Sequence, residues 1–435
     1  MRFKRETEFQ DTEIGKIPKE WKVVKLKDIA TKIKMGGTPK RTVKEYWNGE
    51  ILFAKIEDIT NSGKYLLSTS STITRLGLEN SNAWLVPMNS LLITIYGTLG
   101  MVIINKIEVA TNQAIVGVIP KRELVDVEFL YYWYLYYQPN WIKFVKKSTQ
   151  PNLTLEIVAN SKLPLPSLAE QKVIAEILST VDRAIEVVDA GVVRLEGLKK
   201  ALMRELLTGR IRVREENGKP VFHRETEFQE TEIGKIPREW KVVKLKQVAE
   251  IRGSKKIAEG VDKVAFISME AVPDSGLYVS YEIRNLSEVK SFVYCEPGDI
   301  LLAKITPSFE NGKQGIVPDN IPGKFALATT EVYPIKCNGI DKLFLFYLLK
   351  YPPIRNKLAS LMRGTTGRRR VPREALESAS LPDPPIREQR MIAEILSVLD
   401  RAIDLHYRER ERLDRLKRGL IDLLLTGRVR VVRED

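Results

Sequence analysis

One stretch of the sequence carries side chains that could hydrolyse a phosphodiester bond. Pro273 and Asp274 precede Glu288, Val289 and Lys290, and in such a set two carboxylates could hold Mg²⁺ while the lysine assists an attacking water. A site of this kind would make the chain a stand-alone Mg²⁺-dependent DNA endonuclease. The pattern is loose, however, and a chain in which 29% of the residues are charged contains it often by chance. Solvated loop charges are the simpler interpretation, and the endonuclease stays an alternative.

Side chains for nucleophilic or zinc chemistry are scarce. The two cysteines, Cys295 and Cys337, and the two histidines, His223 and His406, fit no zinc-ligand spacing. Two cysteines also provide no disulfide framework, which is typical of a reducing compartment, so we expect a cytoplasmic location. Residues 80–105 lack charge, but their proline, glycines and asparagines favour strands and turns over a membrane span.

Two short strings imitate nucleotide or cofactor motifs without completing them. GGTPKRT at 36–42 lacks the Lys-Ser/Thr pair of a phosphate-binding loop. DPPI at 383–386 is similar to the DPPY motif of amino-methyltransferases, but its aromatic residue is missing and no glycine-rich cofactor loop accompanies it. A proline hinge explains this string better. We therefore assign no catalytic residue, no metal ligand and no cofactor to this chain.

The charge distribution favours a polyanionic partner. The 435 residues include 70 Lys and Arg against 56 Asp and Glu, a net charge of +14. Residues 1–166 carry 23 basic and 16 acidic groups (+7), and residues 223–385 carry 25 and 21 (+4). Most of the excess therefore lies in two separate regions, which favours binding of a polyanion at two points over one basic surface.

Each of these regions contains two basic sets, one near its beginning and one near its end. Lys and Arg neutralise phosphates, and Arg also reads base edges. The DNA-binding candidates are Lys32, Lys34, Lys40, Arg41, Lys143, Lys146, Lys147, Arg252, Lys255, Lys256, Arg363, Arg368, Arg369, Arg370 and Arg373. Weaker candidates for base contacts are Gln150, Asn152, Thr365 and Thr366. A solvated basic surface is the alternative for any single residue.

The elements that must position these groups belong to one sequence unit that occurs twice in the chain. Residues 5–30 recur at 224–249 with 22 identities in 26, and IAEILSTVDRAI at 174–185 recurs as IAEILSVLDRAI at 392–403. The segment LLTGR ends both copies. Between these matches the two copies share only faint landmarks. Near-identical frames around dissimilar inserts indicate common assembly surfaces and two different ligands.

Each copy ends in a long helix that begins after a proline-rich hinge. Its apolar residues recur every three or four positions, as in a coiled-coil seam. The stripes are Ile174, Ile177, Val181, Ile185, Val188, Val192, Leu195, Leu198, Leu202 and Leu206, and Ile392, Ile395, Leu399, Ile403, Leu413, Leu416, Leu420 and Leu424. His406 and Arg410 interrupt the second stripe, where a polar register-setting position or a snorkelling side chain is expected. Two copies related by a pseudo-twofold axis should pair these helices antiparallel, with Gly209 and Gly427 as C-caps.

The expected organisation is α+β, a pseudo-twofold cyclic repeat in which two variable α/β domains alternate with two repeated long helices. Aromatic or leucine-rich helices at 128–138 and 341–351 should be buried core elements rather than base-stacking surfaces. The expected boundaries are domain one at 1–166, helix one at 167–208, a linker at 209–223, domain two at 224–385, helix two at 386–425, and a tail at 426–435 near the N-terminus.

This arrangement resembles a specificity subunit of a type I restriction–modification system. The resemblance covers essentially the whole chain and depends on the repeated EIGKIPxEWKVVKL opening, PSLAEQKVIAEIL at 166–178, PIREQRMIAEIL at 385–396 and both LLTGR ends. It implies that each variable region is a target recognition domain for one half of a bipartite, asymmetric DNA site. It also implies that the helices fix the gap between the half-sites.

The resemblance further implies that the chain is not an enzyme but docks catalytic partners. These would be two modification subunits that methylate DNA with S-adenosylmethionine, and restriction or translocase subunits that use ATP and Mg²⁺. Glu170 and Glu388, with Gln171 and Gln389, begin the long helices and could dock these partners; helix N-terminal capping is the equal alternative. A DNA-binding regulator that acts without enzyme partners is the remaining alternative function.

Overall fold

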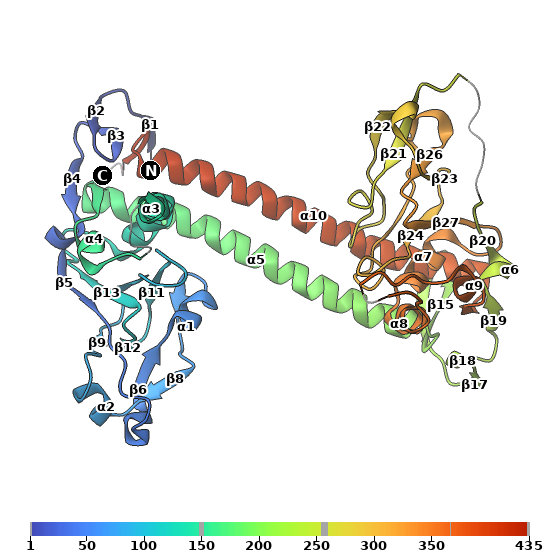
Figure 1. The fold of residues 1–435 in the computed structure, drawn as a ribbon, viewed down its shortest axis with the longest axis horizontal. Helices are drawn as coiled ribbons and strands as arrows, with labels where there is room; N and C mark the ends of the chain where they lie inside the picture. Colours follow the sequence, from blue (N-terminus) through green and yellow to red (C-terminus); the bar gives the residue numbers. More distant parts are fainter. Residues whose placement is uncertain (1, 148–151, 254–259, 366, 433–435) are drawn as a thin grey trace. The chain divides into compact units, whose positions relative to one another are not determined.

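The computed structural model describes residues 2–147, 152–253, 260–365 and 367–432 (Figure 1). Its contacts divide the chain into two compact units. Unit 1 contains Met1–Val187 and Arg410–Asp435, and unit 2 contains Val188–Glu409. The division falls inside the two long helices, α5 (Leu168–Leu206) and α10 (Ile386–Leu425). Within the described residues, no helix has the length and apolar character needed to cross a membrane.

Two sheets form the variable part of unit 1. The five-stranded sheet has the order β5 (Ala30–Met35), β13 (Ile115–Pro120), β10 (Leu91–Thr94), β11 (Val102–Asn105) and β7 (Tyr65–Leu66). The four-stranded sheet has the order β8 (Ser71–Ile73), β6 (Trp47–Ala54), β12 (Val109–Thr111) and β9 (Leu85–Val86). The short helices of this unit are α1 (Ile56–Thr60), α2 (Arg75–Glu79) and α4 (Leu155–Ala159).

Unit 2 repeats this sheet pattern with a different sequence. Its first sheet has the order β20 (Ala249–Ile251), β27 (Val332–Cys337), β24 (Ile300–Ala303) and β25 (Gln314–Ile316). Its second has the order β22 (Glu282–Asn285), β21 (Lys263–Ile267), β26 (Ala326–Ala328) and β23 (Val293–Cys295). The central pair of this second sheet, β21 with β26, is parallel, as is β6 with β12 in unit 1. Apart from β7, which has no counterpart among the described strands of unit 2, the two variable regions therefore share one topology.

Each variable region is closed by a helix whose bulky side chains are buried. In unit 1 this is α3 (Val127–Lys147), in which Tyr132 and Trp133 are fully or almost fully buried. In unit 2 it is α7 (Lys342–Lys350), followed by α8 (Pro352–Ser360), and the α7 residues Phe344–Leu349 are buried. Burial of these large apolar side chains stabilises the core. The prediction of core helices rather than base-stacking surfaces is confirmed.

The repeated opening segments form the same small strand pairs in both units. In unit 1, β2 (Phe9–Thr12) pairs with β3 (Gly15–Pro18), and β4 (Lys22–Lys25) pairs with β14 (Lys162–Leu165). In unit 2, β17 (Phe228–Thr231) pairs with β18 (Gly234–Pro237), and β19 (Lys241–Lys244), followed by α6 (Leu245–Val248), pairs with β28 (Ser380–Asp383). Strands β14 and β28 lead directly into α5 and α10, so each pair fixes the start of a long helix to the opening.

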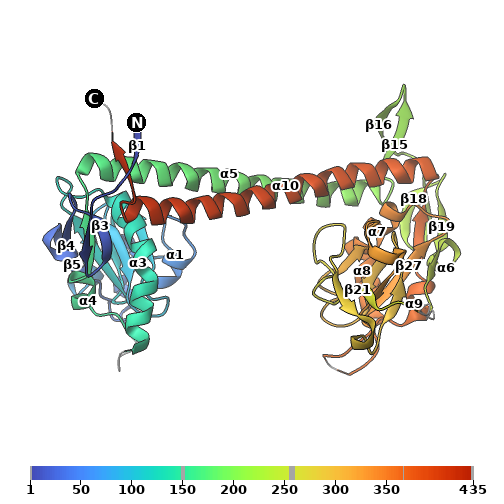
Figure 2. The same cartoon turned by 90° about the horizontal axis from the view of Figure 1, so that it is seen from above.

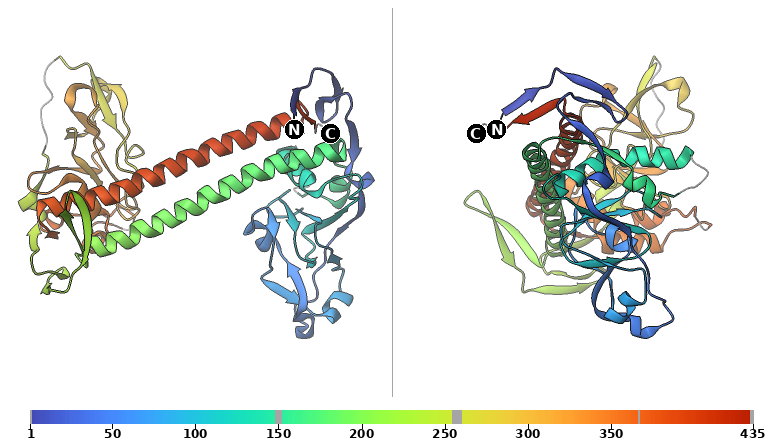
Figure 3. Two further views of the ribbon diagram at one scale, coloured as in Figure 1. Left: turned by 180° about the vertical axis from the view of Figure 1, so that it is seen from behind. Right: turned by 90° about the vertical axis from the view of Figure 1, so that its left-hand side faces the viewer.

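The two ends of the chain lie side by side in unit 1 (Figures 1 and 3). Strand β1 (Arg2–Arg5) pairs antiparallel with β29 (Val429–Val432). The equivalent residues of unit 2 are continuous, and they form the hairpin β15 (Ile211–Glu216) and β16 (Lys219–Arg224). The sequence assigned these residues to a linker. They form a hairpin because Asn217 and Gly218 both adopt positive φ (52° and 73°), as a two-residue turn requires.

The long helices pair antiparallel within each unit, as expected. In unit 1, Lys417 Nζ lies 2.6 Å from Asp182 Oδ1. In unit 2, the Tyr407 hydroxyl donates to Glu196 Oε1 (2.8 Å), and Lys199 pairs with Asp400. Residue numbers in one helix fall as those in the other rise. Two members of the expected seam differ: Leu198 and Leu416 are 47% and 50% exposed.

The interruption of the seam at His406 has a steric partner. A Cβ added at Gly191 would lie 2.8 Å from the His406 ring, so the imidazole occupies the space beside this glycine. The ring Nδ1 lies 2.9 Å from the Ala402 carbonyl. The predicted register-setting role of His406 is consistent with this single close contact. A Cβ at Gly197 would meet no described atom within 4 Å, so that glycine has no comparable role.

Candidate nucleic-acid interface

A tight arginine-rich loop, residues 363–370, precedes α9 (Arg373–Glu377) in unit 2. The Arg363 N–H donates to the Arg370 carbonyl (2.9 Å), and the Arg370 N–H donates back to the Arg363 carbonyl (2.8 Å). Gly364 and Gly367 have φ values of +130° and +81°, which other residues adopt only at a cost. The two glycines thus allow the chain to reverse within this closed loop.

Hydrogen bonds fix the backbone of the arginine loop to a neighbouring segment of the same unit. The Thr306 N–H donates to the Arg369 carbonyl (3.0 Å), and the Val371 N–H donates to the Lys304 carbonyl (2.9 Å). The four arginine side chains of the loop remain exposed. An anchored backbone with exposed cationic side chains is suited to holding a phosphate backbone.

The arginines of the loop differ in their ion pairs. Arg369 lies 3.2 Å from Glu310 Oε1 and Arg370 lies 3.5 Å from Glu331 Oε1. Their side chains are 47% and 62% exposed, and such exposed pairs contribute little, so a phosphate could replace the carboxylate. In the described part of the chain, Arg363 and Arg368 form no side-chain ion pair. The latter two are the cations most available to DNA.

Two other candidates are held by hydrogen bonds within unit 2, although the Arg373 side chain is 45% exposed. Arg373 donates to Glu377 Oε1 (2.7 Å) and to the Ile251 carbonyl (2.8 Å). The Arg252 side chain is 16% exposed and binds Asp299 (3.0 Å) and Glu296 (2.7 Å). Both arginines brace the protein, which their position in the sequence did not indicate. We therefore leave them out of the proposed contact set.

The first basic set of unit 1 is exposed as expected. Lys32 and Lys34 lie two residues apart on β5, the edge strand of the five-stranded sheet. The Lys32 ammonium is 4.3 Å from the centre of the Trp84 ring, which favours one side-chain position. Lys40 and Arg41 lie in the turn that follows, and the Trp47 indole donates to the Lys40 carbonyl (3.3 Å).

The remaining candidates receive less support. Lys143, Lys146 and Lys147 lie in the last two turns of α3. Thr365 is exposed in the arginine loop and Asn152 is half-buried. Four candidates lie outside the described residues and stay predictions: Lys255, Lys256, Gln150 and Thr366.

The candidate nuclease residues have separate local roles. The Asp274 carbonyl accepts a hydrogen bond from Lys350 Nζ (2.8 Å). Glu288 ends a short 3-10 helix, Leu286–Glu288, and accepts from the Asn285 amide (2.7 Å). Across the described ranges, no group of three or more His, Cys, Asp or Glu side chains is arranged to hold a metal ion.

Neither thiol is set up as a nucleophile. Burial raises the pKa of Cys295 far above its usual range, and its sulfur donates to the Ala326 carbonyl (3.3 Å). Burial also raises the pKa of Cys337 to about 12. Both sulfurs therefore stay protonated at neutral pH, and a protonated thiol is a poor nucleophile.

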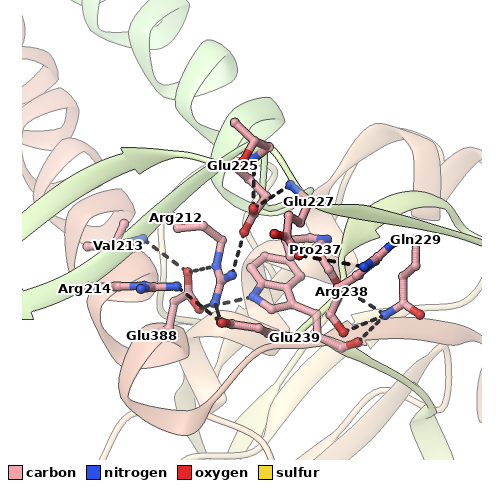
Figure 4. Close-up of polar contacts among 12 residues, drawn as sticks. Arg212, Val213, Arg214, Glu225, Glu227, Gln229, Pro237, Arg238, Glu239 and Glu388 are labelled. Atoms are coloured by element: carbon pink, nitrogen blue, oxygen red, sulfur yellow. Dashed lines mark hydrogen bonds and ion pairs between the residues drawn. The ribbon is translucent and has the colours of Figure 1, made fainter.

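A buried ion-pair cluster fixes the frame of unit 2 (Figure 4). Arg212 of β15 forms two parallel hydrogen bonds to Glu388 of α10 (2.7 and 2.8 Å). It also binds Glu225 (2.8 Å) and Glu239 (3.1 Å), and the Trp240 indole donates to Glu388 (3.1 Å). The Arg212 and Glu388 side chains are 3% and 5% exposed. Burial alone would lower the pKa of Arg212, but the hydrogen bonds to Glu388 and Glu225 raise it above its ordinary value.

Unit 1 contains the same cluster built from equivalent residues. Arg430 of β29 donates to both carboxylate oxygens of Glu170 in α5 (2.7 and 2.9 Å). It also contacts Glu6 (3.1 Å) and Glu20 (3.0 Å), while the Trp21 indole donates to Glu170 (3.2 Å). In each unit the cluster joins the strand that follows one long helix to the first turn of the other.

These contacts correct the expectation for the first turns of the long helices. Glu170 and Glu388 are 5% and 4% exposed, so they are internal ion-pair partners and are not available to dock another subunit. Gln171 and Gln389 are also buried. Their amide oxygens accept from the backbone N–H groups of Asp126 and Asp341, which adjoin α3 and α7 respectively.

A second polar contact joins the variable region of unit 2 to both long helices. Asp400 of α10 accepts from the Tyr347 hydroxyl of α7 (2.7 Å) and pairs with Lys199 of α5. Tyr347 is fully buried, and burial together with the neighbouring Asp400 raises the pKa of its phenol well above the usual range. One carboxylate therefore holds three helices together.

The equivalent contact in unit 1 uses Asp182. This carboxylate accepts from the Tyr132 hydroxyl of α3 and lies 2.6 Å from Lys417 Nζ of α10. Lys64, which is buried, donates to Tyr132 (3.0 Å) and to Ser179 (2.7 Å). Each variable region is thus attached to the helix pair by the same Tyr–Asp–Lys arrangement.

The sequence contained a signal for these clusters, which is that their charged residues recur in both copies of the repeat. The three glutamates, the tryptophan and the arginine of each cluster lie in segments that recur nearly unchanged. A charged residue preserved in both copies indicates either a buried partner or a shared surface, and only the contacts distinguish the two.

A family model described as type I restriction modification DNA specificity domain matches residues 18–190 and 237–415. The chain belongs to this family. The two matched segments of the specificity domain fall on the two copies of the repeat, and together they cover most of the chain. The predicted family is confirmed.

Two curated relatives match almost the whole length of this chain. The specificity subunit of the type I restriction enzyme MjaVIII from Methanocaldococcus jannaschii is 29% identical over 99% of this chain and 98% of its own length. The putative MjaX specificity subunit of the same organism is 28% identical over 99% of both chains. The solved type I restriction-modification S subunit from M. genitalium has a TM-score of 0.55 at 15% identity, covering 93% of this chain and 96% of its own, which shows a shared fold.

Family membership decides between the functional alternatives. The chain is a DNA-specificity subunit, and recognition rather than catalysis is its role. The endonuclease alternative through Asp274 and Glu288 is therefore not supported. DNA is the partner class of this family, and the exposed cations of the arginine loop and of β5 are compatible with it.

Proposed function

We propose that each variable region is a target recognition domain that reads one half of a bipartite, asymmetric DNA site. The proposed domains extend over residues 1–166 and 224–385. Each domain reads its own half-site independently of the other. One observation carries the proposal: both regions share a sheet order, while their sequences share only faint landmarks. A common scaffold with different surface residues is what two different half-sites require.

The two repeated long helices are the part of the protein that serves both recognition domains. Helices α5 and α10 have 39 and 40 residues, so each is about 60 Å long at 1.5 Å per residue. They act as the ruler between the half-sites and dock two modification subunits, with restriction or translocase subunits completing the complex. Those partners supply S-adenosylmethionine, ATP and Mg²⁺ chemistry. The two free thiols are compatible with the reducing cytoplasm.

The phosphate contacts of the arginine loop are tested by salt dependence. Replacing Arg368 by Ala removes one exposed cation and should weaken binding to all DNA sequences alike. The slope of log affinity against log salt concentration should flatten by about one unit, because one fewer counterion is released. Fluorescence anisotropy with duplex DNA at several salt concentrations measures both effects.

The matched control is Arg373→Ala. Arg373 follows the same loop but is held by Glu377 and the Ile251 carbonyl, so this variant should keep the wild-type slope. An unchanged slope for Arg368→Ala, or an equal change for both variants, would remove the loop from the proposed interface.

A further inference from the structure

A groove of 830 Å³ lies in unit 2 where the variable region meets both long helices. Figure 2 shows α7 and α8 beside these helices, and the Tyr347–Asp400 contact joins α7 to α10. Two loops, residues 274–276 and 310–312, complete the walls. Much of the wall is apolar or aromatic and is formed by Met203, Tyr351, Pro352, Pro353, Ile403 and Tyr407. A groove of this volume is large enough to hold a small organic molecule.

Two cations that line this groove have no acidic partner. In the described part of the chain, Lys350 and Arg355 form no ion pair with a carboxylate. Arg355 is only 5% exposed. Its guanidinium donates to neutral oxygens, which are the carbonyls of Phe309 (2.8 Å), Leu349 (3.2 Å) and Lys313 (3.4 Å) and the side-chain oxygen of Gln314 (2.9 Å). A buried cation without a negative partner is unfavourable, so an anion bound beside it would be stabilised.

The pKa values of both cations reflect this lack of negative charge. Burial lowers the pKa of Arg355 to about 10. The pKa of Lys350 is lowered to about 8, mainly by burial and also by the neighbouring cations Lys199 and Arg355. A bound anion would favour the charged form of both groups.

Both cations also keep N–H groups that have no acceptor among the described residues. Lys350 Nζ carries three N–H donors and uses one of them for the Asp274 carbonyl (2.8 Å). The Arg355 guanidinium carries five N–H donors and forms four hydrogen bonds. Three donors on positively charged groups therefore remain for a ligand.

The acidic residues of the groove are mostly bound to other partners. These contacts are Asp400 with Lys199, Asp404 with Arg408 (2.7 Å), Glu310 with Arg369 (3.2 Å) and Glu196 with the Tyr407 hydroxyl (2.8 Å). Asp274 is the exception, but it is exposed, and its charge only partly offsets that of Lys350. The groove therefore combines an apolar wall with two cations whose charge is not neutralised.

Unit 1 contains an equivalent but smaller groove of 410 Å³. Asp182 and Lys417 line it, and they correspond to Asp400 and Lys199 in unit 2. In the described part of unit 1, each cation of this groove has a carboxylate partner: Lys417 pairs with Asp182, Lys64 with Glu128 and Arg410 with Asp414.

The Tyr–Asp contact of each unit aligns α3 with α7 and identifies what differs. Three and eight residues after its tyrosine, unit 1 has Leu135 and Asn140, whereas unit 2 has Lys350 and Arg355. Leu135 lines the smaller groove as Lys350 lines the larger one. The position of the groove is thus repeated, but its two unneutralised cations are a feature of the second copy.

We propose that the groove of unit 2 binds a small phosphate monoester that carries an apolar or aromatic group. The two positive charges match the double negative charge of such a phosphate, which accepts strong hydrogen bonds from Lys350 and Arg355. The apolar wall covers the rest of the ligand. The bound molecule would contact α5, α10 and α8 together and so hold the variable region of unit 2 against the helix pair. This binding goes beyond DNA recognition and does not depend on it.

Calorimetric titration of the full-length chain with naphthyl phosphate tests the proposal. One molecule should bind per chain, because the groove of unit 1 lacks the two cations. Inorganic phosphate and naphthol each keep only half of the ligand's chemistry and should bind at least about 10-fold more weakly. Lys350→Leu, which introduces the residue found in unit 1, should weaken binding of naphthyl phosphate roughly 10- to 100-fold. Bound naphthyl phosphate should also slow hydrogen exchange in residues 342–360.

Two control variants separate this site from general charge effects and from misfolding. Lys357→Leu removes an exposed lysine of α8 that does not line the groove and should keep the wild-type affinity. Lys350→Arg keeps the positive charge and should bind within a few-fold of the wild type. The proposal would be overturned by a wild-type chain that does not bind naphthyl phosphate, by equal affinities of the wild type and Lys350→Leu, or by displacement of naphthyl phosphate by duplex DNA.

Discussion

Arg212→Ala is expected to lower the free energy of unfolding of unit 2 by about 3–5 kcal/mol. The change leaves the Glu388 carboxylate buried, at 5% exposure, without its two charged hydrogen bonds. It also separates hairpin β15–β16 from the first turn of α10. Urea denaturation followed by circular dichroism, with calorimetry to resolve the two units, measures the loss.

Arg214→Ala is the matched control for this prediction. Arg214 lies two residues away on the same strand and pairs with Glu239 at 3.3 Å, but both side chains are more than half exposed. Its loss should cost less than about 1 kcal/mol. Arg430→Ala should reproduce the large effect in unit 1, where Arg430 takes the place of Arg212. Equal costs for Arg212→Ala and Arg214→Ala would show that the cluster does not hold the frame.

Asp400→Ala should cost about 2–4 kcal/mol, because it removes the acceptor of a buried phenol and the partner of Lys199 at the same time. Since this carboxylate joins α7 to both long helices, hydrogen exchange in the α7 segment should also become faster. Calorimetry gives the stability change, and exchange measured by mass spectrometry locates it.

The control for this second prediction is one turn further along α10. Asp404 forms an exposed pair with Arg408 at 2.7 Å, and Asp404→Ala should change stability by no more than about 0.5 kcal/mol. If exchange in α7 stayed at the wild-type rate in Asp400→Ala, the attachment of the recognition domain would have to depend on apolar packing alone.

Much of the architecture could be predicted because local sequence patterns determine it. The proline-rich hinges and the three- and four-residue apolar spacing predict α5 and α10 closely. The hairpin β15–β16 was predicted as a linker, although Asn217-Gly218 is a strong turn signal. The residues on either side of this turn show only a weak alternation of charged and apolar side chains. The pairing of β15 with β16 becomes evident only from the equivalent strands β1 and β29, which pair at the two ends of the chain.

The candidate site was less predictable because burial and pairing depend on residues distant in sequence. Arg252 and Arg368 are both cations in basic segments, yet Asp299, 47 residues further on, holds only the first. Glu170 meets Arg430 across 260 residues. Leu198 and Leu416 continue the apolar spacing but are exposed. The spacing identifies one face of a helix but does not show which part of that face another element covers. Such outcomes require the tertiary contacts.

The reading of one half-site by each recognition domain can be tested by exchanging residues 31–160 for the corresponding insert of another specificity subunit. Methylation-sensitive sequencing of cells carrying the wild-type and the exchanged chain reads both motifs. We expect a split motif in which one half changes, while the other half and the gap stay the same. A continuous motif, or a change in both halves, would contradict it.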